Sequence, residues 1–228
     1  MPLEIVHERK SGESAKDFVY RVLKYNITSL ILPPNDTIEE FAIATQLSVS
    51  RTPVREAILA LMREELIEVF PQRSTKVTRI DINIIDQSIF GIKALEDQII
   101  KDACNMIHHG SIDTIKANIE QEKAALEKEN IFELATALYK FHNSLFVVFH
   151  KEKLFCVFDR FFYHIVREWM LEISMVPFAQ LIEHQEAIVN AITQHNCNDA
   201  IMHHTFYVEH LKCDHESLKI AFPSYFLN

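Results

Sequence analysis

The chain has 228 residues, a length that suits one large domain or two modest ones, each able to bury a hydrophobic core. Its 23 basic and 32 acidic residues give a net charge of -9, which taken as an average argues against binding a polyanion such as nucleic acid. No apolar run approaches the roughly 18 residues of a membrane span and the N-terminus has no signal-peptide core, so we expect a cytoplasmic protein without membrane association.

The charge is distributed unevenly along the chain. Residues 1–80 carry 11 basic and 11 acidic residues, whereas residues 81–228 carry 12 and 21. Eleven of the twelve histidines also lie in the second stretch. We therefore predict two domains, 1–80 and 81–228, with the entire excess of negative charge in the second.

Three helices are predicted in the first eighty residues. Ser14 and Asp17 have the spacing of a capping box, and the apolar periodicity that follows ends at a Pro-Pro pair. A second helix fits Thr37–Gln46. After a short break, a third helix is expected from Ser50, its N-cap, to about Glu65.

A β-hairpin is predicted to follow these helices. Residues 66–70 and 76–80 alternate in the manner of strands, and the polar residues 71–75 between them are expected to form the tip. Two helices joined by a tight turn and followed by a hairpin make a winged helix-turn-helix, with the hairpin as the wing.

The start of the third helix suits contact with DNA. Arg51 and Arg55 are four residues apart and therefore share one helix face. Arginine can donate two hydrogen bonds to guanine in the major groove, while Ser50, Thr52 and the first-turn N–H groups can hold a phosphate. Pro53 costs no helical hydrogen bond at this position. The alternative is an ordinary helix start with two surface arginines.

Over residues 22–77 the chain resembles the GntR family of bacterial transcription regulators. The segments that carry the resemblance are Ile38–Ala42, Leu47–Ile58 and Leu61–Ile67. The most specific of them contains the string S-R-T-P-V-R-E-A at residues 50–57. The resemblance favours DNA recognition over the alternative of an ordinary helix start.

The resemblance also implies roles for individual residues. Arg51 and Arg55 would make the main operator contacts, and the wing tip would enter the minor groove. The residues implied to contact DNA are Lys24, Ser50, Arg51, Thr52, Arg55, Gln72 and Arg73. The family commonly has glycine where this chain has Ser29, Asn35, Glu65 and Ser74, and glycine there would serve a positive φ or a tight turn.

Beyond residue 81 the sequence predicts an all-α antiparallel bundle. About six long amphipathic segments are interrupted near residues 109–110, 129–130, 175–177 and 196–198. An aromatic cluster at mostly helical spacing is expected in the core or at a dimer interface: Phe155, Phe158, Phe161, Phe162, Tyr163 and Trp169. The cysteines, expected to be reduced structural thiols, are Cys104, Cys156, Cys197 and Cys213.

This second part resembles the FCD effector domain of the FadR subfamily. The anchors are Leu95-Glu96, Phe141-His142 and the segment His184–Ile192. The resemblance implies a bundle that dimerises and binds a small organic acid or another metabolite, often through a divalent metal.

The metal ligands of that family are mostly missing here. Only His142 matches a ligand position, whereas the other three positions hold Leu138, Gln185 and Tyr207. Leucine cannot ligate a metal, and glutamine and tyrosine replace imidazole poorly at a first-row metal. We therefore expect no tightly bound metal and no other cofactor. His142, Gln185 and Tyr207 are instead predicted to donate and accept hydrogen bonds with an organic effector.

A relocated metal site is the alternative. His184 is adjacent to Gln185, and His203 and His204 lie one turn before Tyr207. Neighbouring residues on a helix point about 100° apart, so an adjacent histidine rarely takes over a ligand position without rearrangement. Histidines on the surface or satisfied in the core are the expectation.

No catalytic motif is present, so we expect no enzyme. The chain has no H-E-x-x-H, no G-x-S-x-G, no P-loop and no paired Glu-x-x-His motifs. The expected function is that of a sequence-specific regulator, a homodimer on a pseudopalindromic double-stranded operator, at the nucleoid when bound. The alternatives are a C-terminal domain that only dimerises, a ligand-free architectural DNA-binding protein and a helical metalloenzyme.

Overall fold

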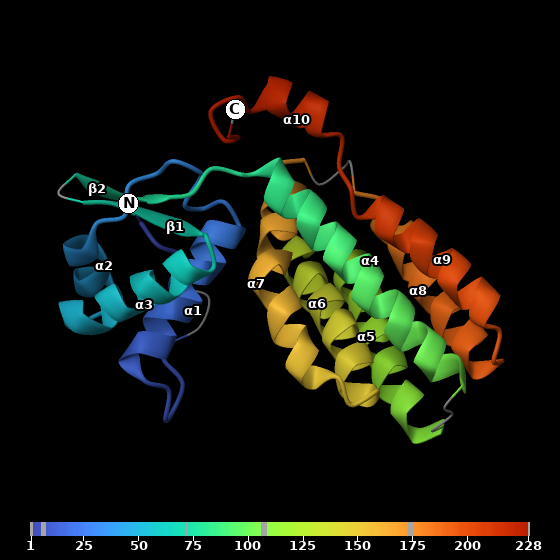
Figure 1. The fold of residues 1–228 in the computed structure, drawn as a ribbon. Helices are drawn as coiled ribbons and strands as arrows, with labels where there is room; N and C mark the ends of the chain where they lie inside the picture. The colour runs from blue at the N-terminus through green and yellow to red at the C-terminus, as the bar shows by residue number, and fades with distance from the viewer. Residues whose placement is uncertain (1, 6–7, 72, 106–108, 173–175, 228) are drawn as a thin grey trace. The chain divides into compact units, whose positions relative to one another are not determined.

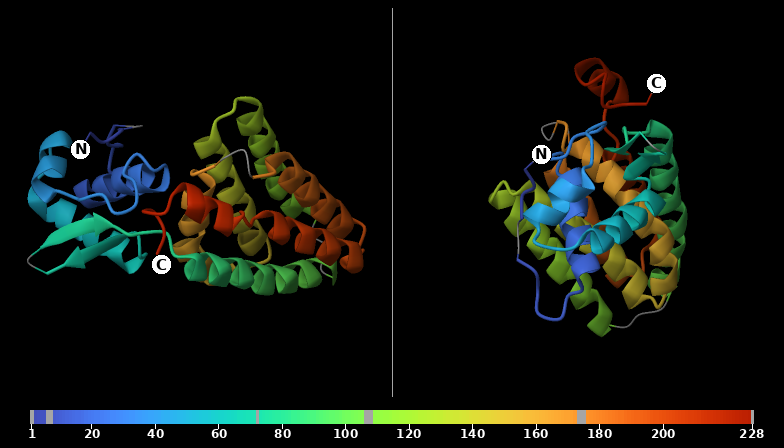
Figure 2. Two further views of the ribbon diagram at one scale, coloured as in Figure 1. Left: turned by 90° about the horizontal axis from the view of Figure 1, so that it is seen from above. Right: turned by 90° about the vertical axis from the view of Figure 1, so that its left-hand side faces the viewer.

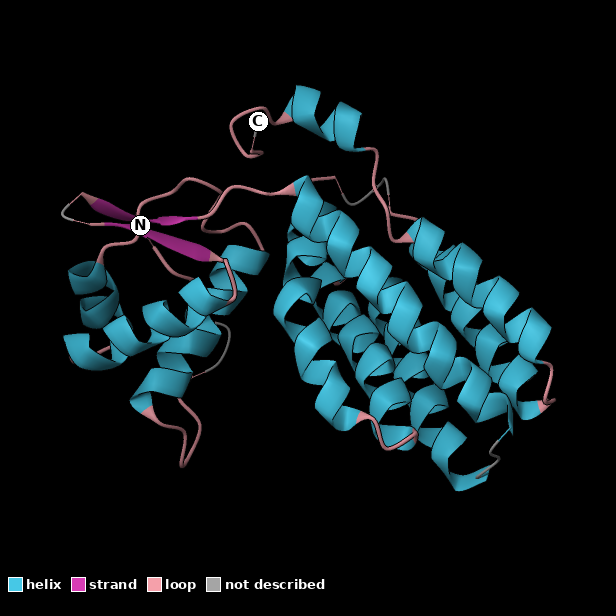
Figure 3. Ribbon diagram, viewed as in Figure 1, coloured by secondary structure: helices cyan, strands magenta, loops and turns pink. Residues whose placement is uncertain are grey.

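The computed structural model describes residues 2–5, 8–71, 73–105, 109–172 and 176–227, and this part of the chain is mainly helical. Figure 1 gives the order of the elements, and Figure 3 shows that the strands are confined to one hairpin. The elements are α1 Ala15–Thr28, α2 Glu40–Gln46, α3 Arg51–Arg63, β1 Ile67–Phe70, β2 Ser74–Val77, α4 Ile82–Asn105, α5 His109–Glu127, α6 Ile131–Val148, α7 Glu152–Trp169, α8 Phe178–Thr193, α9 Cys197–His210 and α10 His215–Ala221. The mainly α fold class predicted from the sequence is confirmed.

The chain forms two compact units. Unit 1 comprises residues 1–82, 166–171 and 215–228, and unit 2 comprises residues 83–165 and 172–214. In unit 1 the C-terminal segment returns to the first domain, because the Ile80 N–H donates to the Tyr225 carbonyl at 2.7 Å and the Leu227 N–H donates to the Ile80 carbonyl at 2.9 Å. The sequence did not indicate this return. The boundary expected at residue 80 stays a prediction.

The helices of unit 1 begin and end close to where their caps predict. Ser14 is the N-cap of α1, and its hydroxyl accepts a hydrogen bond from the Asp17 N–H at 3.1 Å. Ser50 is the N-cap of α3. The prediction that α2 starts at Thr37 is wrong by three residues. Thr37 pairs with Lys76 in an isolated antiparallel bridge, so this stretch is extended beside the hairpin and α2 starts at Glu40.

The predicted hairpin is present, with a shorter tip than expected. β1 and β2 are antiparallel, and the register places Ile67 opposite Val77 and Phe70 opposite Ser74. The prediction that Ser74 and Thr75 belong to the tip is wrong, because both lie in β2. The strands therefore continue further before they reverse.

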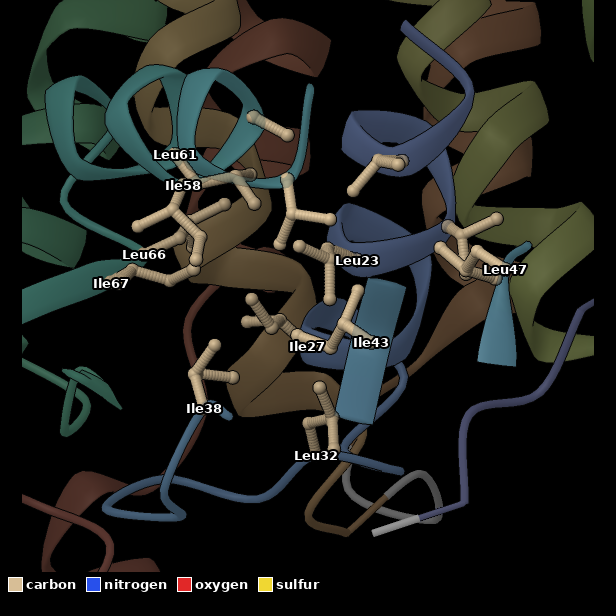
Figure 4. Packing of buried hydrophobic residues seen from close by; sticks show 14 of the residues in the cluster. Leu23, Ile27, Leu32, Ile38, Ile43, Leu47, Ile58, Leu61, Leu66 and Ile67 are labelled. Carbon is tan, nitrogen blue, oxygen red and sulfur yellow. The ribbon is translucent and has the colours of Figure 1, made fainter. Parts of the chain in front are cut away.

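Apolar side chains from α1, α2, α3 and the β1–β2 hairpin form one core (Figure 4). Leu23 and Ile27 of α1, Ile43 of α2 and Leu61 of α3 are each fully buried. Burial of such side chains contributes about 1.5–3 kcal/mol each. The helix-turn-helix is thus held by apolar packing, which leaves the polar first turn of α3 at the surface.

At two of the four positions where the family commonly has glycine, the residue of this chain adopts the positive φ that favours glycine. Asn35 has φ 70° and Glu65 has φ 60°, whereas Ser29 has φ -85° and its neighbour Leu30 adopts φ 60° instead. Asparagine tolerates this left-handed region well, but glutamate does so at a cost of about 1–2 kcal/mol.

Unit 2 is an antiparallel helical bundle, as predicted. α5 packs against α6 and against α8, and α8 packs against α9, as the two views in Figure 2 also show. Short turns near residues 128–130 and 194–196 reverse the chain between these helices, near two of the predicted breaks. No helix within the described residues is long and apolar enough to cross a membrane.

The aromatic cluster is largely buried, as expected of core residues. Phe155, Phe162 and Trp169 are buried, and Tyr163 is half-buried. The side chains of Phe158 and Phe161 lie outside the described residues. Cys104, Cys197 and Cys213 form no disulfide, as expected, but only Cys104 is buried and the other two are half-buried; the Cys156 side chain also lies outside the described residues.

Candidate functional site

The first turn of α3 presents two arginines to solvent. The side chains of Arg51 and Arg55 are 56% and 60% exposed, and Thr52 is exposed between them. Ser50 makes no side-chain cap bond, so its hydroxyl is not committed to the helix. Helical spacing places both arginines on one face, whereas Val54, Ala57 and Ile58 turn inward. This arrangement suits insertion of the helix into a major groove.

Glu40 holds both arginines in place, a contact that sequence reasoning missed. One oxygen, Glu40 Oε2, accepts from Arg51 Nη2 at 3.0 Å and from Arg55 Nε at 2.8 Å. Burial alone would raise the pKa of Glu40, but the hydrogen bonds from Arg55 and Arg51 outweigh it and lower this pKa below its ordinary value. Glu40 is therefore an anion that fixes the spacing of the two guanidinium groups. The only signal in the sequence was its place in a segment that carries the family resemblance.

The other predicted DNA contacts are placed differently. Lys24 pairs with Glu64 at 2.9 Å and bonds to the Tyr20 hydroxyl at 3.0 Å, so a phosphate contact would compete with an existing ion pair. Arg73 is exposed at the hairpin tip, where its N–H donates to the Phe70 carbonyl at 3.0 Å. Gln72 lies outside the described residues.

In unit 2 the three predicted effector residues come together in the interior. His142, Gln185 and Tyr207 come from α6, α8 and α9, and all three are fully buried. The Tyr207 hydroxyl lies 2.9 Å from His142 Nε2 and 3.4 Å from Gln185 Nε2. The role of these three side chains in binding an effector stays a prediction.

Four further residues extend this cluster. Among them, Glu96 was named from the sequence only as an anchor of the resemblance and His204 only for the relocated metal site, whereas Asp97 and Glu122 were not identified. Glu96 of α4 contacts His142 Nδ1 at 2.6 Å through one oxygen and His204 Nε2 at 3.0 Å through the other. His204 Nδ1 lies 2.6 Å from Asp97 Oδ1. Glu122 of α5 is fully buried. We call this set, with His142, Gln185 and Tyr207, the interior network.

The contacts define the protonation of the interior network. Both ring nitrogens of His204 face carboxylates, which only accept, so both carry protons and His204 is a cation. Burial would lower the pKa of His204, but the bonds with Asp97 and Glu96 raise it. Burial would likewise raise the pKa of Glu96, yet the hydrogen bonds with His142 and His204 and the charge of His204 lower it. The carboxylate of Glu96 is thus ionised although it is buried.

Glu122 has the opposite character. Burial raises the pKa of Glu122 well above its ordinary value, and the nearby Gln185 amide opposes this only in part. Burial also raises the pKa of Tyr207, and the negative charge of Glu96 adds to the effect. Neither oxygen of the Glu122 carboxyl has a hydrogen-bond partner in the described part of the chain. One end of the interior network is therefore ionic, whereas burial favours the neutral form of Glu122 at the other end.

A divalent metal fits this cluster poorly. Both nitrogens of His142 are engaged, by Glu96 and Tyr207, and the remaining positions offer a buried leucine, an amide and a phenol. For the relocated site, His184 and His203 do meet, with their Nδ1 atoms 3.3 Å apart, but His204 turns to Glu96 instead. Among the described residues, no group of three or more histidine, cysteine or acidic side chains is arranged to hold a metal.

A pocket of about 540 Å³ opens at one end of α5 and α8. Its lining residues are Leu126, Glu129, Ile131, Val176, Pro177, Phe178, Ala179 and Gln180. Most of this wall is apolar, and none of the interior network residues belongs to it. Leu126 nevertheless lies one helical turn after Glu122, on the same face of α5.

Comparison with known proteins also divides the chain into an N-terminal and a C-terminal part. Residues 15–77 match the gntR family of bacterial regulatory proteins, and residues 92–203 match the FCD domain. The HTH-type transcriptional repressor RspR of Escherichia coli (strain K12) is 28% identical over 127 residues, 56% of this chain and 56% of the repressor. The match thus spans just over half of that relative's length.

Solved structures resemble the chain over nearly its whole length. E. coli McbR/YncC has a TM-score of 0.71 at 18% identity, covering 93% of this chain and 99% of that one. A putative transcriptional regulator GntR from Rhodococcus sp. RHA1 has a TM-score of 0.68 at 17% identity, covering 92% and 98%. At such identities the likeness establishes the fold. The two family matches show that the chain joins a domain of the gntR family of bacterial regulatory proteins, residues 15–77, to an FCD domain, residues 92–203, and the relatives that it matches are named as transcription regulators.

Proposed function

We propose that the chain is a sequence-specific, cytoplasmic regulator of transcription that binds a pseudopalindromic DNA operator as a homodimer. The observation that carries this proposal is the exposed pair of Arg51 and Arg55 on one face at the start of α3. In a two-fold dimer, two such helices would enter successive major grooves. Each arginine would donate two hydrogen bonds to a guanine.

Glu40 supports this role by orienting the arginines before DNA arrives. A guanidinium held by a carboxylate loses less conformational freedom on binding than a free one. The carboxylate also repels phosphates, so it weakens contacts with the DNA backbone while it preserves contacts with bases. Glu40 would therefore favour specific over non-specific DNA.

The interior network favours an effector-sensing role for unit 2 within the FadR subfamily. Buried polar groups without partners are unfavourable unless they serve a ligand, and Glu122 and Gln185 supply three such oxygens. A ligand that binds there would shift the distance or orientation of the two DNA-binding heads, for which a coupling of about 1–3 kcal/mol suffices. We propose that this occurs without a divalent metal, because the donor set fits one poorly. A unit 2 that only dimerises is the alternative.

The DNA-binding test starts from random duplex DNA. A preferred site is selected from it with the purified full-length protein, and affinity is measured by fluorescence anisotropy. Arg51→Ala should weaken binding by about 1–3 kcal/mol. Arg63→Ala is the matched control, since Arg63 is exposed at the other end of the same helix. Equal effects of the two substitutions, or selection of no preferred sequence, would contradict the proposal.

A further inference from the structure

The Glu122 end of the interior network contains three buried oxygens that have no partner. They are both carboxyl oxygens of Glu122 and Oε1 of Gln185. Both side chains have 0% exposure. Leaving such atoms unbonded in the interior is unfavourable, and a group that donates hydrogen bonds would remove the penalty. The vacant hydrogen-bonding capacity at this end therefore calls for a donor.

The rest of the interior network directs its donors away from Glu122. Tyr207 accepts from Gln185 Nε2 and so donates its only proton to His142 Nε2. His142 in turn donates through Nδ1 to Glu96. These bonds run from the centre of the bundle toward α4, and among the described residues Glu122 is left with the Gln185 amide as a nearby donor, which offsets its burial only in part. An incoming ligand would have to bring its own.

The charges of unit 2 disfavour an anion at this place. Among its described residues, the buried polar and charged side chains include glutamate, histidine, glutamine and serine, but no lysine or arginine. The cation His204 is already shared by Glu96 and Asp97. A carboxylate ligand would lack a counter-charge beside Glu122, and burial of an unpaired charge is strongly unfavourable.

The pocket at the ends of α5 and α8 supplies room for an apolar body. Leu126 in its wall lies about 6 Å along the helix axis from Glu122, and Phe178 lies about 10 Å along α8 from Gln185. The helices α5 and α8 pack together, and Glu122 and Gln185 are fully buried neighbours on them. An alkyl chain of about five carbons spans the distance of about 6 Å between Leu126 and Glu122.

We propose that the α5–α8 seam binds a small alkyl amine, with its ammonium group donating to Glu122 and to Gln185 Oε1 and its apolar chain in the pocket lined by Leu126 and Phe178. This inference rests on the proposed function, since the amine would be the effector of unit 2. It replaces the organic acid expected from the family resemblance by a cation. Binding would release the proton of Glu122, leaving a carboxylate paired with the ammonium.

The experiment compares three probes of one length, pentylamine, pentanoate and pentanol, by isothermal titration calorimetry on the full-length protein in about 0.15 M salt. We expect saturable binding of pentylamine, weaker binding of pentanol and none of pentanoate. Glu122→Gln keeps the shape of the side chain but removes its charge, and should lower the affinity for pentylamine by about tenfold or more. Glu120→Gln, an exposed change on the same helix, should leave the affinity unchanged.

Three results would overturn the inference. They are pentanoate or pentanol binding at least as tightly as pentylamine, equal pentylamine affinity in Glu122→Gln, and no saturable binding by any alkyl amine from propylamine to octylamine. Circular dichroism confirms that each variant is folded, and Gln185→Met provides a second variant of the site. DNA binding is measured separately without any amine. A protein that selects an operator but ignores amines refutes only this inference, whereas loss of sequence selectivity refutes the proposed function.

Discussion

Glu122 makes the interior of unit 2 less stable than an apolar residue would, and Glu122→Met should reverse this. Methionine is unbranched like glutamate, so it can follow the same path in the core. An unsatisfied buried polar group costs about 1–3 kcal/mol, and Glu122 is fully buried with neither carboxyl oxygen bonded. Allowing for imperfect packing of the new side chain, we expect the free energy of unfolding to rise by about 2 kcal/mol.

The gain should depend on pH in a defined direction. The pKa of Glu122 is raised in the folded protein above its ordinary value of 4.5, so the folded state holds this proton more tightly than the unfolded state. The carboxyl is least unfavourable below the unfolded pKa, and stability is lost as the pH rises through the folded pKa. The advantage of Glu122→Met over the natural protein should therefore be larger at alkaline than at mildly acidic pH.

Urea unfolding followed by circular dichroism measures both effects. The unfolding midpoint should shift upward while the slope with denaturant stays the same. Glu120→Gln is the control, and its effect should stay within about 0.5 kcal/mol. Glu122→Met that destabilises the protein at every pH would refute the reasoning, because it would mean that the carboxyl has a favourable partner.

Four other predictions follow from the same structure. Glu65→Gly should raise the free energy of unfolding by about 0.5–1 kcal/mol, because Glu65 adopts φ 60°; a lower thermal midpoint would contradict this. The pKa of His204 is raised in the folded protein, so its stabilising contribution is complete below the ordinary pKa of 6.5 and is lost as the pH rises through the higher pKa of the folded state; urea titrations of His204→Gln should lack this loss. Glu40→Gln should increase the affinity for non-specific DNA about fivefold and thereby lower the ratio of specific to non-specific affinity, both measured by fluorescence anisotropy. Chelation with EDTA should change neither the thermal midpoint nor operator affinity, and a drop in either would indicate a bound metal.

Local sequence determined the helix-turn-helix and much of the bundle. The Ser14 cap, the Ser50 cap and the hairpin depend on residues close together in the chain, so spacing and turn chemistry predict them. Apolar periodicity alone predicted antiparallel helices beyond residue 81. The start of α2 was misplaced because Thr37 bonds to the hairpin, and that pairing is between residues far apart in the sequence.

The candidate sites were predicted only in part. Resemblance led to Arg51 and Arg55, and alignment of ligand positions led to His142, Gln185 and Tyr207, which the structure brings into contact. Whether these three bind a ligand stays a prediction. His184, His203 and His204 were grouped from the sequence as candidates for one relocated metal site, yet the structure separates them: His204 pairs with carboxylates, whereas His184 and His203 face one another.

The sequence by itself determined which residues are polar, charged or apolar and which local elements they form. Tertiary structure alone decided which of them meet. Glu96 and His204 are 108 positions apart, and Glu40 and Arg55 are 15 apart on different helices. Burial depends on the packing of whole helices, and so does the ionisation it controls. Two glutamates of one bundle, Glu96 and Glu122, therefore have pKa values shifted in opposite directions, because histidines face only the first.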